Sequence, residues 1–160
     1  MVDWVARITD AAAEQLEPGE TVLGGAEFTA TAFAILGTRS SGGFLGLRRP
    51  GQPPEAAVTI PRRGVAVGVT QNRLLVYGLA GFGRITDRLA EFHLDDVVQV
   101  VVREVPGNVI RVQPPSASVR FVLVDGTEVS GSMVSAGPAG RANITLLDGL
   151  AEARPGLISR

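Results

Sequence analysis

An apolar segment from Val65 to Tyr77 constrains the fold more than any other part of the sequence. It contains two runs rich in valine and leucine, residues 65–70 and 73–77, separated only by Gln71-Asn72. Asparagine tolerates the positive φ angles that tight hairpin turns need, so the pattern predicts a β-hairpin. Strands in such hairpins must close or stack to cover their edges, which indicates a β-rich fold.

The rest of the chain predicts further strands between two helices. Apolar residues at helical spacing predict a first helix from Asp3 to Leu16, which Pro18-Gly19 ends. No helix is expected between the strands, so parallel βαβ folds are disfavoured. The expected elements are a long strand over 21–36, a glycine-rich turn at 78–83, strands over 89–94 and 97–105, a hairpin at Asp125-Gly126, and a helix over 137–153 that buries Ile144, Leu147 and Ala151.

Trp4 allows two interpretations. It is either an exposed anchor for a partner or a residue that packs the first helix onto the strands, and its place on the apolar face of that helix favours packing.

Composition excludes several kinds of chemistry. The chain has no cysteine, no lysine and a single histidine, His93, so thiol nucleophiles, Schiff-base lysines and His-rich metal sites are excluded. The formal net charge of −1 provides no basic field for nucleic acid. We therefore expect a protein that is not an enzyme, needs no cofactor or metal, and binds no nucleic acid.

The residues with catalytic potential have simpler interpretations. His93 lies at the end of a predicted strand, and Asp95-Asp96 form a predicted turn in which adjacent carboxylates point apart. An enzyme stays a third hypothesis, which would need His93 within hydrogen-bond distance of Asp95 or Glu91.

The first residues lack a charged segment followed by an apolar one, and the apolar runs are too short to span a bilayer. We expect a cytoplasmic protein, with peripheral attachment to the inner face of the membrane as the alternative.

Three short motifs carry a likeness to a known family. They are the Pro-Gly-Glu within residues 16–23, the Thr-x-x-Arg-Leu-Leu within 69–77, and the Leu-Asp-Asp-Val within 92–97. These motifs occur in the family's order, and a hairpin and a helix follow them as in the family. The chain therefore resembles bacterial pleckstrin-homology-like (PH-like) domains, including the GRAM-related group, over about residues 16–153.

The resemblance implies a mainly β, single-domain fold. Its parts would be an N-terminal helix in 1–19, an antiparallel β-barrel of about seven strands in 20–136, and a capping helix in 137–155. In that plan Leu146, Leu147 and Leu150 would plug the barrel. Members of this family bind lipids, bind proteins or self-assemble.

A long loop over 37–64 departs from the family pattern and holds the candidate binding residues. Arginine forks suit phosphate, and an apolar residue beside them suits a membrane interface. Two functional hypotheses follow: a module that binds protein partners or associates with itself, and a peripheral binder of anionic lipid or phosphate through residues 39–63. The candidate binding residues are Arg39, Phe44, Arg48, Arg49, Arg62 and Arg63.

Overall fold

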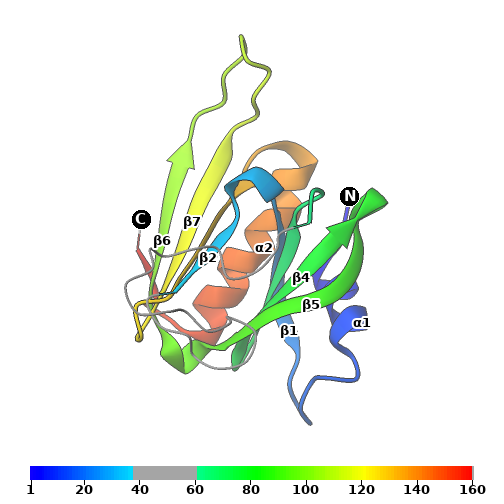
Figure 1. Cartoon of the computed structure of the whole chain (residues 1–160), viewed down its shortest axis with the longest axis vertical. Helices are drawn as coiled ribbons and strands as arrows, with labels where there is room; N and C mark the ends of the chain where they lie inside the picture. Colours follow the sequence, from blue (N-terminus) through cyan, green and yellow to red (C-terminus); the bar gives the residue numbers. More distant parts are fainter. Residues whose placement is uncertain (38–60, 160) are drawn as a thin grey trace.

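The computed structural model describes residues 1–37 and 61–159 of the chain. These residues form two β-sheets and two α-helices, which confirms a mainly β fold (Figure 1). The first sheet has the order β1 (Val22–Phe28), β3 (Val65–Thr70), β4 (Arg73–Ala80) and β5 (Arg84–His93). The second has the order β2 (Ala34–Leu36), β8 (Glu128–Val134), β7 (Ser116–Leu123), β6 (Val97–Val105) and β9 (Ile158–Ser159).

The described strands do not close into one barrel, which corrects that part of the expectation. No ladder of backbone hydrogen bonds joins the two sheets within the described residues. One outer edge of the first sheet, on β1, is covered by a helix instead of by another strand. The edge of β1 therefore needs no partner strand.

The hairpin predicted at Gln71-Asn72 is confirmed. Strands β3 and β4 are antiparallel, and Val69 faces Leu74 next to the turn. Every residue of β3 is buried. Helix α1 (Trp4–Ala12) covers one face of the strand, and the main core lies against the other face. Two-sided burial explains why this segment is apolar throughout and does not alternate.

Helix α1 starts as predicted but ends early. The Asp3 carboxylate accepts a hydrogen bond from the Ala6 N–H at 2.9 Å and caps the helix, which ends at Ala12 and not at Leu16. Trp4 is 3% exposed, which confirms its packing role, and Ile8 lies over Gly25 and Gly68 in the sheet.

The long strand predicted over 21–36 is wrong, because the chain changes sheets inside it. A 3₁₀ turn at Ala30–Ala32 separates β1 from β2. Phe28 and Phe33 both point into the core, with ring centroids 5.8 Å apart in an edge-to-face arrangement. The side chains that face the core therefore belong to even-numbered residues before the turn and to odd-numbered residues after it.

The next two strands differ less from expectation. Strand β5 begins at Arg84, five residues before the predicted start, because only Gly81–Gly83 of the glycine-rich segment form the turn. Strand β6 has the predicted bounds.

Helix α2 (Gly137–Ala153) crosses β1 at close range. A Cβ on Gly24 would lie 2.0 Å from the Thr145 carbonyl oxygen, so only glycine fits there. The Thr145 hydroxyl and the Asn143 side chain bond to the backbone of β1 at Gly25 and Glu27.

Since these polar side chains of α2 face β1, the buried face of the helix is rotated from the predicted one. Leu146, Leu147 and Leu150 are buried as the resemblance implies, whereas Ile144 and Ala151 are exposed, contrary to expectation. Within the described ranges, no helix is long and apolar enough to cross a membrane.

Candidate functional site

The structure describes only two of the six predicted binding residues. Arg39, Phe44, Arg48 and Arg49 lie outside the described residues. Arg62 and Arg63 are exposed in a turn that the Gly64 N–H closes by bonding to the Pro61 carbonyl oxygen at 3.0 Å.

This turn lies beside the last residues of β4. The Leu79 N–H donates to the Gly64 carbonyl oxygen at 3.1 Å, which joins the turn to the strand that leads into the β4–β5 connection. In that connection Phe82 is fully exposed and has a φ of 61°. Arg7 of α1 fixes it by donating to the carbonyl oxygens of Phe82 and Gly83 at 3.1 and 2.6 Å.

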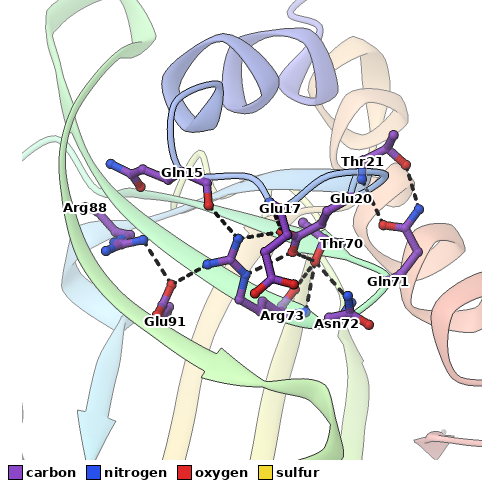
Figure 2. Close-up of polar contacts among 10 residues, drawn as sticks. All are labelled: Gln15, Glu17, Glu20, Thr21, Thr70, Gln71, Asn72, Arg73, Arg88 and Glu91. Carbon is purple, nitrogen blue, oxygen red and sulfur yellow. Dashed lines mark hydrogen bonds and ion pairs between the residues drawn. The ribbon is translucent and has the colours of Figure 1, made fainter.

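The most elaborate polar arrangement is buried at the other end of the β3–β4 hairpin (Figure 2). The Arg73 guanidinium donates two bonds to the Glu20 carboxylate, from Nε at 2.9 Å and from Nη2 at 2.5 Å. It also donates to Glu91 and to the Gln15 carbonyl oxygen, each at 2.9 Å. We call Gln15, Glu17, Glu20, Thr70, Arg73 and Glu91 the Glu20 cluster.

Both oxygens of Glu20 have further donors. The Thr70 hydroxyl donates to Oε1 at 2.6 Å, and the Glu17 N–H donates to Oε2 at 2.9 Å. The side chains of Glu20 and Arg73 are only 1% and 10% exposed. A buried ion pair persists when hydrogen bonds satisfy its remaining groups, as they do here.

Electrostatics follow from this geometry. The hydrogen bonds from Arg73 are the largest influence and, against the opposing effect of burial, help lower the pKa of Glu20 to about 2. The same pairing raises the pKa of Arg73 above its usual value. Both groups therefore stay charged over the whole range in which a general acid or base would work.

The Glu20 cluster explains two of the sequence motifs. Glu20 belongs to the Pro-Gly-Glu segment, and Thr70 and Arg73 belong to the Thr-x-x-Arg segment, so the two motifs bind each other. Sequence reasoning missed this contact. Its signal was a charged residue, Arg73, at the start of an otherwise apolar strand.

A second feature that sequence reasoning missed is the connection between β6 and β7. It extends beyond the rest of the molecule as a narrow hairpin (Figure 1). We call residues 108–113 the hairpin tip. Val109 and Ile110 are each 95% exposed and Val112 is 89% exposed, an unusual concentration of aliphatic surface.

The C-terminal residues that the structure describes return to the second sheet. We call residues 154–159 the tail. Ile158 and Ser159 form β9, which pairs in parallel with Val100 and Val101 of β6. The Val100 N–H donates to the Leu157 carbonyl oxygen at 3.0 Å. A cavity of about 400 Å³ lies between the tail and the last turns of α2.

The enzyme hypothesis receives no support from the described residues. No hydrogen bond joins His93 to Asp95 or Glu91 there, and Arg73 and Arg88 bind the Glu91 carboxylate. The same part of the chain contains no group of His, Asp and Glu side chains that could hold a metal ion.

Comparison with known proteins yields distant likenesses among solved structures alone. No family model and no curated protein match the sequence. Among solved structures, the hSac2 domain from the human phosphoinositide phosphatase Sac2 is similar, with a TM-score of 0.43 and 9% sequence identity. The match covers 91% of this chain and 76% of that chain. A likeness of this size supports no assignment of fold family or function to this chain.

Proposed function

We propose that this chain is a non-catalytic, PH-like interaction module that binds an extended protein segment along the edge of β6. The segment is either part of a partner protein or the tail of a second copy. Support for the PH-like plan comes from the motifs that resemble the family, two of which form the Glu20 cluster, and from a helix, strands and a final helix in the expected order.

The observation that carries the proposal is the position of β9. Strand β6 has nine residues, and its own tail pairs with only two of them, Val100 and Val101. An unpaired strand edge presents N–H and C=O groups to any extended chain, which is how peptides join a sheet. The pairing of β9 with β6 supports the proposal that this edge binds an extended segment.

The tail pairs with few residues of β6. Besides β9, it is attached by the packing of Leu157 and Ile158 against the main core and by an ion pair between Arg154 and Asp95, whose side chains are 44% and 85% exposed. Exposed ion pairs contribute about 0–1 kcal/mol. A competing segment that pairs with more of β6 would therefore displace the tail.

A chain that ends at Arg154 tests the proposal. We expect it to bind a labelled peptide of residues 155–160 in fluorescence anisotropy, whereas the full chain binds the peptide more weakly because its own tail competes. A peptide with the reversed sequence is the matched control. Equal binding of both peptides, or none by the shortened chain, would contradict the proposal.

A second candidate is peripheral binding of anionic lipid, which a different surface favours. Arg62 and Arg63 are exposed beside the end of β4, and Phe82 is exposed in the connection that follows. Arginine forks bind phosphate groups, and an aromatic ring prefers the membrane interface. If this surface binds lipid, R62A/R63A should lower co-sedimentation with vesicles that contain phosphatidylglycerol, and binding unchanged from the parent chain would exclude it.

A further inference from the structure

The hairpin tip has the properties of a segment that enters a lipid interface. Its three exposed aliphatic side chains, those of Val109, Ile110 and Val112, belong to the connection between β6 and β7, which projects beyond the rest of the molecule (Figure 1). Exposed apolar area of this kind is costly in water, at roughly 25 cal/mol per Å². A projecting apolar tip needs no matching pocket on a protein partner when it enters a bilayer.

The backbone of the tip is prepared for an apolar environment. Asn108 and Gln113 exchange two N–H to C=O bonds, at 2.8 and 2.9 Å. The Val112 N–H donates to the Val109 carbonyl oxygen at 3.2 Å, and the Arg111 N–H donates to the Asn108 side chain at 3.1 Å. Since four tip donors are bonded internally, moving them out of water costs much less than exposing free ones. This pattern favours lipid over strand pairing with a protein, which needs free donors.

Charge also favours a membrane with anionic lipid. The sequence contains no acidic residue from Val105 to Leu123. Arg111 lies between Ile110 and Val112 and is exposed. An arginine beside apolar side chains keeps its charge at the level of the phosphates while its neighbours enter the interface.

We infer that the hairpin tip inserts Val109, Ile110 and Val112 into the interface of a bilayer that contains anionic lipid, with Arg111 at the phosphates. This inference is independent of peptide binding at the edge of β6, and it uses a different surface from the one around Arg62, Arg63 and Phe82.

The test is co-sedimentation of the full chain with vesicles of phosphatidylcholine, with and without phosphatidylglycerol. We expect binding to the anionic vesicles, a reduction of roughly tenfold or more in V109S/I110S, and a smaller one, roughly fivefold, in R111A. V124S is the matched control, because Val124 is also an exposed valine, 69% exposed, but lies in the β7–β8 turn. This variant should bind vesicles like the parent chain.

Three vesicle-binding results would overturn the inference. They are no binding of the parent chain to anionic vesicles, equal binding of V109S/I110S and the parent chain, and loss of binding in R62A/R63A but not in the tip variants. A protein partner would appear as self-association by light scattering that V109S/I110S abolishes while no vesicles bind, which also overturns the inference. Circular dichroism of each variant confirms that the fold is retained.

Discussion

The Glu20 cluster and the hairpin tip reverse the usual distribution of polarity. In the cluster, the charged side chains of Glu20 and Arg73 are buried, and in the tip, aliphatic side chains are exposed. The cluster satisfies its groups within the chain, because both oxygens of Glu20 accept hydrogen bonds and three nitrogens of Arg73 donate them. The tip leaves its apolar side chains without cover.

This difference separates stability from binding. A buried charge with all its partners inside the chain contributes to folding and has little left to offer a ligand. An exposed apolar group without partners contributes little to folding and is available for contact with another surface. Variants in the two regions should therefore affect different measurements.

The largest expected effect comes from breaking the cluster. R73A leaves the Glu20 carboxylate buried without its guanidinium, so we expect a loss of about 3–5 kcal/mol in the free energy of unfolding, measured with urea. R120A removes an exposed ion pair to Glu128 and should cost about 0–1 kcal/mol. Similar losses in both variants would mean that burial gives the cluster no special role.

Acid should weaken the cluster in the pH range that its pKa sets. The pKa of Glu20 is about 2 when folded and 4.5 ordinarily, so its stabilisation is complete above pH 4.5 and is lost as the pH falls toward 2. The expected contribution is about 3 kcal/mol, measured by urea unfolding across this range. E20Q should show a shallower loss, while E128Q should follow the parent chain.

At the tip, the expected change in stability is small and positive. Val112 has a φ of 51°, which a β-branched residue adopts at a cost of about 1 kcal/mol or more. V112N should therefore raise the free energy of unfolding by about 1 kcal/mol, since asparagine tolerates this conformation. V109N is the matched control, because Val109 is as exposed but lacks the positive φ. The strain argument fails if both variants shift the melting temperature equally.

The smallest effect is expected for the aliphatic side chains themselves. V109S/I110S should change the free energy of unfolding by no more than about 0.5 kcal/mol, because both side chains are exposed. F121A, in the next strand of the same hairpin and fully buried, should cost about 3–5 kcal/mol. A large loss in the tip variant would show that the tip packs against the chain.

Sequence patterns predicted the parts of the fold that local chemistry determines. The hairpin at Gln71-Asn72, the start of the first helix near Asp3 and strand β6 follow from turn residues, helical spacing and apolar runs. The change of sheet between β1 and β2 was visible as a break in alternation at Phe33, but a break alone does not distinguish a sheet change from two-sided burial.

The candidate sites were harder to predict because they depend on distant contacts. Glu20 and Arg73 are 53 residues apart, and neither was singled out for binding or catalysis. The tip residues form an apolar run like those of the core, and only the projecting arms of the hairpin show that they are exposed. Of the predicted arginines, the structure describes Arg62 and Arg63, whose role is still a prediction.

The contact between α2 and β1 also has a consequence for synthesis on the ribosome. Asn143 and Thr145, which bond to the edge of β1, follow their partners by 116 and 120 residues. At about 5–20 residues per second, they are translated roughly 6 to 24 seconds after β1. The first sheet is complete only after β5, which ends at His93, and from then until Asn143 is translated its β1 edge lacks the covering helix. We expect the nascent chain to be recognised at this stage by chaperones that bind exposed strands.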